Sequence, residues 1–168
     1  MINIVLYEPE IPQNTGNIMR TCSVFEMKLH LIEPLGFSLD EKHLKRSHMD
    51  YIDELDYKVY KNWDEFIQGK DGQFVYFTRY GMKPFNECVF EKDKDIYLVF
   101  GKESTGIDKQ ILKANLDKCY RIPMRKDARS LNLSNTVAIG AYECLRQVGF
   151  GDLSNFEVIK GKDFLLKC

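Results

Sequence analysis

The chain has 168 residues, with 24 Lys and Arg against 25 Asp and Glu, so its net charge is −1. This length favours one domain, and the 44% hydrophobic and 29% charged residues are typical of a globular protein rather than a disordered one. The near-neutral charge excludes a uniformly basic molecule of the histone kind but leaves room for local basic patches.

The first part of the chain predicts a β-α-β unit. Residues 2–7 are a short apolar run rich in β-branched residues, typical of a buried strand. A stretch containing Pro12 interrupts this run, because proline continues neither a strand interior nor a helix. Asn14-Thr15 then offers an N-cap for a helix that continues to about Met27. Residues 29–32 form a second strand, so the two strands should be parallel with a right-handed crossover.

Strands and helices continue to alternate along the rest of the chain. We expect strands at 57–60, 73–78, 96–100 and 119–122, and helices at 40–48, 63–68, 108–112 and 132–148. The last helix places Leu133, Val137, Ala141, Cys144, Leu145 and Val148 on one face. This order predicts a single-domain α/β fold with a parallel sheet over residues 1–150. The pattern assigns no role to the tail, residues 151–168.

Ligands of such sheets bind at the carboxyl ends of strands, so the segments that follow the strands are candidate sites. After the first strand, Asn14, Asn17 and Arg20 place donors at a helix start, where anions are favoured. The alternative is an ordinary capped helix with a surface arginine.

A second candidate segment follows the strand at 96–100. Gly101 and Gly106 bracket a polar turn there, and glycine lets a backbone approach a ligand closely. Glu103 either contacts the ligand or accepts hydrogen bonds from loop N–H groups, and we favour the second role.

A third candidate segment, 123–135, carries three basic residues beside several small polar ones. Its residues are Arg125, Lys126, Arg129, Ser130, Asn132, Ser134 and Asn135. Basic charge beside hydrogen-bond donors suits a phosphodiester, and the alternative is a solvated charged loop. Lys42, Lys45 and Arg46 form another basic cluster, which is either part of an RNA footprint or a solvated helix face. An RNA footprint of this kind predicts binding that weakens steeply with salt.

These clusters hold no histidine base, no paired catalytic carboxylates and no set of metal ligands. They disfavour hydrolysis and suit a transfer reaction whose donor is already activated. The five cysteines contain no C-x-x-C pair, so we expect neither a disulfide framework nor a zinc site. Without an apolar span or a basic leader, the sequence predicts a cytoplasmic protein with no membrane segment.

Three motifs resemble those of the SPOUT class of RNA methyltransferases: Asn14-x-Gly16-Asn17-x-x-Arg20, Gly101-x-Glu103-x-x-Gly106 and the residues Ser-Leu-Asn-Leu-Ser-Asn at 130–135. Residues 3–12 and 31–37 are similar to members that methylate the ribose 2′-hydroxyl of the tRNA wobble pyrimidine, cytidine or uridine. The resemblance implies a C-terminal deep trefoil knot, S-adenosylmethionine as the cofactor and no metal. It also implies a homodimer with each active site at the subunit interface, and tRNA, with leucine tRNAs expected, as the substrate.

The same resemblance implies roles for individual residues. The cofactor would be held by Phe77, Thr78, Gly101, Glu103, Gly106, Ile122, Ser130 and Leu131. Arg20 would assist catalysis, with Asn135 and Tyr142 as further candidates, and the alternative for Tyr142 is an aromatic in the dimer core. RNA would be bound by Asn14, Asn17, Arg20, Lys42, Arg46, Arg125 and Arg129.

Three other functions are alternatives to this one. The same methyl transfer could act on ribosomal RNA or another tRNA position, because cofactor motifs do not specify the RNA. A non-catalytic RNA-binding protein could keep the fold. A nicotinamide or flavin oxidoreductase is disfavoured, because the G-x-G-x-x-G fingerprint is missing.

Overall fold

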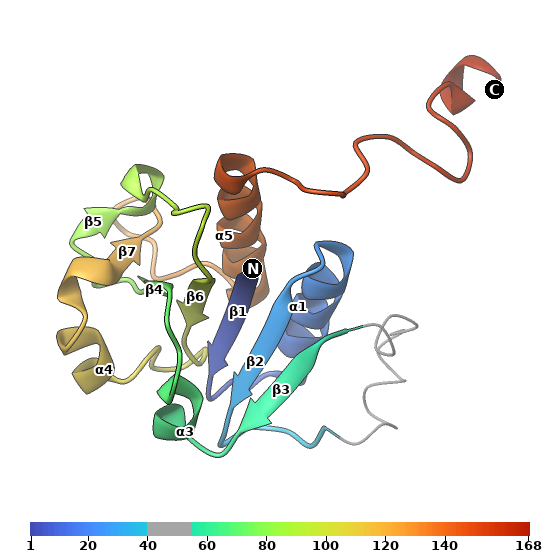
Figure 1. Ribbon diagram of the computed structural model, residues 1–168. Helices are drawn as coiled ribbons and strands as arrows, with labels where there is room; N and C mark the ends of the chain where they lie inside the picture. Colours follow the sequence, from blue (N-terminus) through green and yellow to red (C-terminus); the bar gives the residue numbers. More distant parts are fainter. Residues whose placement is uncertain (40–54) are drawn as a thin grey trace.

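The computed structural model describes residues 1–39 and 55–168, and these form a parallel α/β fold (Figure 1). The strands are β1 (Ile2–Tyr7), β2 (Lys28–Ile32), β3 (Tyr57–Tyr60), β4 (Gln73–Phe77), β5 (Lys83–Pro84), β6 (Ile96–Phe100) and β7 (Cys119–Arg121). They form one seven-stranded sheet in the order β3-β2-β1-β6-β4-β7-β5, with every neighbouring pair parallel. The parallel-sheet α/β class is thereby confirmed. The predicted helix at 40–48, with Lys42, Lys45 and Arg46, lies outside the described residues.

Helices cover both faces of the sheet. They are α1 (Pro12–Val24), α3 (Trp63–Ile67), α4 (Lys109–Lys113) and α5 (Leu133–Val148), with short 3-10 turns at Phe85–Glu87, Leu116–Lys118 and Phe164–Leu166. Helices α1 and α5 pack against each other and share one apolar core with the sheet. Helices α3 and α4 contribute to a second core on the opposite face. No helix among the described residues is long and apolar enough to cross a membrane.

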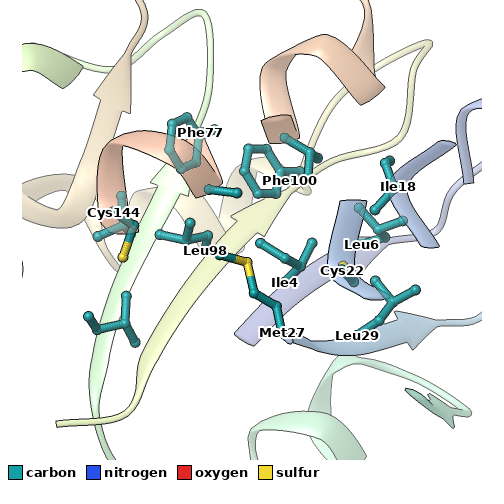
Figure 2. Packing of buried hydrophobic residues seen from close by; sticks show 14 of the residues in the cluster. Ile4, Leu6, Ile18, Cys22, Met27, Leu29, Phe77, Leu98, Phe100 and Cys144 are labelled. Atoms are coloured by element: carbon teal, nitrogen blue, oxygen red, sulfur yellow. The ribbon is translucent and has the colours of Figure 1, made fainter. Parts of the chain in front are cut away.

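The central strands are apolar throughout because both of their faces are covered. In β1, Ile4 and Leu6 point into the core beneath α1 and α5, whereas Val5 belongs to the opposite core. Figure 2 shows the first core, where Ile18 and Cys22 from α1 lie over these strand residues. The six apolar residues predicted to share one face of the last helix all pack in or against this core.

Helix α1 begins at least three residues earlier than predicted, so the N-cap assigned to Asn14-Thr15 is wrong. The helix starts at Pro12, whose fixed φ and missing N–H suit the first helical position. Ile11 is the N-cap residue and makes no side-chain cap hydrogen bond. Asn14 is therefore inside the first turn, where its side chain is buried and available for tertiary hydrogen bonds.

The short edge strand β5 was not predicted. It contains two residues, one of them Pro84, and pairs only with β7 at the edge of the sheet. Proline lacks an N–H donor, so it is tolerated at an edge, but it removes the sequence signal of a strand. At the other end of the chain, the tail extends away from the folded body in Figure 1.

His30 of β2 is buried between two polar side chains. Its Nδ1 lies 2.9 Å from the Tyr60 hydroxyl, and its Nε2 lies 3.0 Å from Asn3 Oδ1. Burial, helped by the charges of Lys70 and Lys28, lowers the pKa of His30 from 6.5 to about 4. The imidazole is therefore neutral in the folded protein at pH 7.

Stability should fall as the pH drops from 6.5 to 4. In that range the unfolded chain binds a proton on His30 that the folded chain does not, so acid favours unfolding. The full effect is about 3 kcal/mol of unfolding free energy. Urea denaturation at several pH values measures it. His30→Gln can still hydrogen-bond Asn3 and Tyr60 but does not titrate, so its pH slope should be smaller. Equal slopes in the two proteins would contradict this account.

Candidate active site

A pocket of about 610 Å³ lies at the carboxyl ends of β4, β6 and β7. Its wall comes from five segments: the start of α1, the turn after β4, the loop after β6, helix α4 and the segment from β7 into α5. The strands are parallel, so the sheet brings these distant segments to one edge. This volume is in the usual range for small-molecule sites.

The Glu103 carboxylate joins the loop after β6 to the start of α1. Its Oε2 accepts a hydrogen bond from the backbone N–H of Glu10 at 2.8 Å. Its Oε1 accepts from the backbone N–H of Ile11 at 3.2 Å and from Asn14 Nδ2 at 3.0 Å. A carboxylate at a helix N-terminus is also favoured by the helix dipole. Glu103 lines the pocket, but its oxygens accept hydrogen bonds from the protein. A structural role was favoured from the sequence, although the donors belong to the start of α1 rather than to the loop that carries Glu103.

Asn14 extends this connection to the start of α5. Its Oδ1 accepts a hydrogen bond from Asn132 Nδ2 at 3.0 Å. Asn132 is in turn the N-cap of α5, because its Oδ1 accepts from the backbone N–H of Ser134 at 2.9 Å and of Asn135 at 3.3 Å. The series Glu103–Asn14–Asn132 therefore links all three predicted motifs.

A second set of contacts joins the same two segments, but here the acceptor is in the segment before α1 and the donors are in the loop after β6. Glu10 accepts hydrogen bonds from the backbone N–H of Ser104 at 2.9 Å and from its hydroxyl at 2.8 Å. Lys102 forms a partly buried ion pair with Glu8. Together with Glu103, these pairs fix the loop after β6 against the segment that precedes α1.

The glycines of the loop after β6 are needed for the loop itself. A Cβ on Gly101 would lie 2.2 Å from the backbone nitrogen of Ile107. Gly106 has a φ of +76°, and its N–H donates to the carbonyl of Lys102 at 3.0 Å. The sequence interpretation assigned these glycines to close ligand approach. The structure shows that at Gly101 the close approach is made by the loop's own backbone.

An aromatic pair forms part of the pocket wall and connects it to the core. Phe77 and Phe100, the last residues of β4 and β6, stack with ring centroids 4.4 Å apart. Gly140 of α5 lies against them, and a Cβ there would be 2.9 Å from the Phe77 ring. The helix can therefore approach the pocket wall closely only because residue 140 has no side chain.

Every residue predicted to bind the cofactor lines this pocket. They are Phe77, Thr78, Gly101, Glu103, Gly106, Ile122, Ser130 and Leu131. Asn14, predicted to bind RNA, lines it too. The sequence interpretation missed Arg79 and Tyr80, which also line the pocket. They directly follow a confirmed strand, so the carboxyl-end rule could have found them.

The predicted catalytic and remaining RNA-binding residues lie elsewhere. Asn17 and Arg20 are exposed on α1, and Asn135 and Tyr142 are exposed on α5. Arg129 is exposed in the loop before α5. None of these is among the described residues that line the pocket.

Arg125, also predicted to bind RNA, is exposed and engaged within its own loop. Its Nε donates a 2.7 Å hydrogen bond to Asp127, with which it also forms an ion pair. This hydrogen bond lowers the pKa of the Asp127 carboxyl.

The site offers neither a metal centre nor an activated thiol among the described residues. No group of three His, Cys, Asp or Glu side chains there could hold a metal ion. Burial raises the pKa of both Cys22 and Cys144 to about 12, so these thiols stay protonated and serve packing. The chemistry available is hydrogen bonding, close backbone contact and positive charge near the pocket.

Known methyltransferases are similar to this chain. The model of the SpoU rRNA Methylase family matches residues 1–142. A Listeria innocua protein provisionally named tRNA (cytidine(34)-2′-O)-methyltransferase is 50% identical over 153 residues, covering 90% of each chain. The tRNA (cytidine(34)-2′-O)-methyltransferase of Escherichia coli is 42% identical, over 89% of this chain and 96% of the relative.

Solved structures show the same fold. One, described as giving structural insights into the 2-OH methylation of C/U34 on tRNA, has a TM-score of 0.81 and 38% identity and covers 88% of this chain and 96% of its own. The SpoU methyltransferase AviRb of Streptomyces viridochromogenes, solved with the cofactor AdoMet, has a TM-score of 0.73 and 22% identity. It covers 86% of this chain and 57% of its own, and at that identity the likeness concerns the fold.

Removing the Glu103 carboxylate should loosen the joined loops. Glu103→Ala leaves the N–H groups of Glu10 and Ile11 and the Asn14 amide without their acceptor. We expect a loss of about 1–3 kcal/mol in unfolding free energy, measured by urea denaturation. Glu87→Ala, at an exposed position, is the matched control and should change stability by less than about 0.5 kcal/mol. Equal effects of the two substitutions would contradict the joining role of Glu103.

Proposed function

The chain belongs to the SpoU rRNA Methylase family, and from that premise we propose that it methylates the ribose 2′-hydroxyl of the pyrimidine at position 34 of tRNA. S-adenosylmethionine is the proposed methyl donor. The observation that carries the proposal is the pocket, whose wall brings together all three motifs of the sequence resemblance. Relatives named for this reaction, at 42% and 50% identity, support the choice of tRNA and of position 34.

The described pocket fits a nucleoside with a short charged side chain. Apolar groups of Ile122 and Leu131 can cover an adenine, while backbone groups of the Gly101–Gly106 loop can hydrogen-bond its polar edge. When bound, S-adenosylmethionine supplies the methyl group as an activated electrophile on a positively charged sulfur. The chain itself then has to hold the donor, align the ribose and assist loss of the hydroxyl proton. No metal is part of this proposal.

Arg20 is the proposed catalytic residue. A guanidinium stays protonated at ordinary pH, so Arg20 does not act as the base. Its proposed role is to bind an RNA phosphate and to stabilise the oxyanion that develops as the hydroxyl proton leaves to a phosphate or water. The methyl–sulfur bond breaks as the methyl–oxygen bond forms, and S-adenosylhomocysteine is released. Asn135 and Tyr142 are further candidates for contact with the ribose.

A homodimer would explain why the proposed catalytic residues lie away from the pocket wall. Asn14 lines the pocket, and Arg20 follows it by six residues on the same helix, a rise of about 9 Å. The outer surfaces of α1 and α5 also expose Val24, Ile139 and Tyr142, with exposed fractions of 54%, 43% and 54%. We propose that these helices meet in a two-fold dimer, so that Arg20 serves the partner's pocket.

The chain path is compatible with the trefoil knot implied by the resemblance. Strand β7 lies beyond β4 in the sheet, yet α5 returns to pack against α1, β1 and β6. The intervening segment reaches α5 past the loops that line the pocket. We propose that this return is the knotted segment, which would explain why the cofactor residues come from loops so far apart in sequence.

Labelled S-adenosylmethionine and total tRNA from a strain that lacks this gene test the reaction. We expect one 2′-O-methyl pyrimidine per acceptor tRNA, mapped to position 34, with leucine tRNAs among the acceptors. Cofactor binding without incorporation into tRNA would indicate another RNA substrate. Absence of cofactor binding would favour a non-catalytic RNA-binding protein.

Mixing two inactive variants tests Arg20 together with the dimer. Arg20→Ala should lose methyl transfer while still binding the cofactor, and Leu131→Trp should fill the pocket and lose cofactor binding. If Arg20 serves the partner's pocket, a mixed dimer contains one complete site, and an equimolar mixture should recover about a quarter of wild-type activity. Failure to recover activity, although sedimentation shows mixed dimers, would place Arg20 in its own subunit's site. Wild-type activity of Arg20→Ala would remove it from the mechanism.

A further inference from the structure

The turn after β4, residues 78–82, occupies the mouth of the pocket and has no role in the three motifs. Thr78, Arg79 and Tyr80 line the pocket together with the residues of the cofactor prediction. Met82, in the same turn, is 78% exposed and is not among the lining residues.

This turn is held firmly against β7. The backbone N–H of Thr78 donates to the carbonyl of Tyr120 at 3.0 Å, and Arg121 Nη1 donates to the carbonyl of Arg79 at 2.7 Å. Gly81 presses on the same strand, since a Cβ there would lie 2.4 Å from the Tyr120 carbonyl carbon. Within the turn, the N–H of Tyr80 donates to the Thr78 hydroxyl at 3.2 Å. The backbone that carries Arg79 and Tyr80 is therefore fixed.

The Tyr80 side chain, by contrast, is presented to solvent. It is 62% exposed and belongs to neither apolar core. The guanidinium carbon of Arg79 lies 5.4 Å from its ring centroid, a distance at which a cation is attracted to an aromatic ring. A planar ring and a planar cation thus lie beside each other at the mouth of the pocket.

The surroundings of this pair are positively charged. Lys109 lines the same pocket, and the Arg121 guanidinium hydrogen-bonds the backbone of the turn. Among the described residues, none of Arg79, Lys109 and Arg121 forms an ion pair with a carboxylate. An exposed aromatic ring beside positively charged side chains can bind an unpaired base of RNA. The ring stacks on the base, and the cations attract the phosphates.

We propose that Arg79 and Tyr80 form a stacking platform for an unpaired base of the tRNA anticodon loop. This inference rests on the proposed function, because it takes the anticodon loop as the substrate. The platform binds a base next to the reacting nucleotide and so helps to place that nucleotide's ribose at the pocket. Tyr80 is then a specificity-determining residue that contacts the RNA and takes no part in the chemical step.

The test uses an anticodon stem–loop RNA with 2-aminopurine in the loop, whose fluorescence is quenched by stacking. Quenching on binding to the wild-type protein is expected to disappear in Tyr80→Ala. That variant should bind the RNA about 5- to 100-fold more weakly, as removal of one stacked base does elsewhere. Tyr80→Phe keeps the ring and should behave as wild type. Met82→Ala, on the same turn and outside the pocket lining, is the matched control and should also leave RNA binding unchanged.

Cofactor binding and turnover separate the platform from its alternatives. Tyr80→Ala should keep wild-type affinity for S-adenosylmethionine, and its KM for tRNA should rise far more than its kcat falls. A parallel loss of cofactor affinity would assign Tyr80 to the cofactor and overturn the proposal. Unchanged RNA affinity in Tyr80→Ala, or absence of stem–loop binding by the wild type, would overturn it as well.

Failure of the proposed function would appear differently. The wild-type protein would then bind S-adenosylmethionine and methylate no tRNA, whereas the fluorescence titration still measures stacking without catalysis. Quenching that depends on Tyr80 would then support the platform independently of the reaction.

Discussion

The hydrogen-bonded series Glu103–Asn14–Asn132 is the constraint on which the site depends. Asn14 is 89 residues from Glu103 and 118 residues from Asn132, and the three belong to segments that follow different strands. Each member serves two segments: Glu103 accepts from the start of α1, Asn14 is buried between the loops, and Asn132 caps α5. A buried amide that lost its partner would cost free energy, so the three segments keep their relative positions only as a unit. The pocket is the space that these segments enclose.

Under the proposed function, this arrangement would separate the residues that hold the cofactor from those that contact the RNA. The pocket wall consists of strand ends and loops that are fixed by β6 and β7, whereas Arg20 and Tyr142 are exposed on helices that begin at those loops. Asn14 is in the first turn of α1, and Asn132 caps α5, so the same hydrogen bonds that shape the pocket also set where both helices begin. A helix is stiff, so its exposed residues inherit a defined position relative to the pocket. Residues outside the pocket wall can therefore hold a fixed position relative to the pocket without lining it.

The fold was predictable because the sheet is buried on both faces. Strands such as residues 2–7 and 96–100 then appear as uninterrupted apolar runs, and the helix faces are periodic. The start of α1 was not predictable, because a buried Asn14 has the same local sequence pattern as a capping asparagine. Only its hydrogen bonds to Glu103 and Asn132, which are distant in sequence, show that it joins loops instead of capping the helix. The pocket residues were predicted from the resemblance to a family. The spacing of the residues alone was also compatible with a capped helix and a solvated loop. Arg79 and Tyr80 were missed although they follow a predicted strand directly and precede Gly81, so applying the carboxyl-end rule to every strand would have included them.

The balance of charges also bears on how a near-neutral chain can bind RNA. Some of the basic charge is paired locally: Lys102 with Glu8, Arg125 with Asp127 and Arg146 with Glu143. Such cations attract a distant polyanion weakly, because each is accompanied by its carboxylate. At the pocket mouth the described cations are fixed instead by backbone and ring contacts, as with Arg121 on the carbonyl of Arg79 and Arg79 beside Tyr80. Under the proposed function, RNA that enters here would meet Arg79 and Arg121, neither of which forms an ion pair with a carboxylate among the described residues. Short-range contacts at that mouth, more than the overall field of the protein, would then decide which nucleotide reaches the pocket.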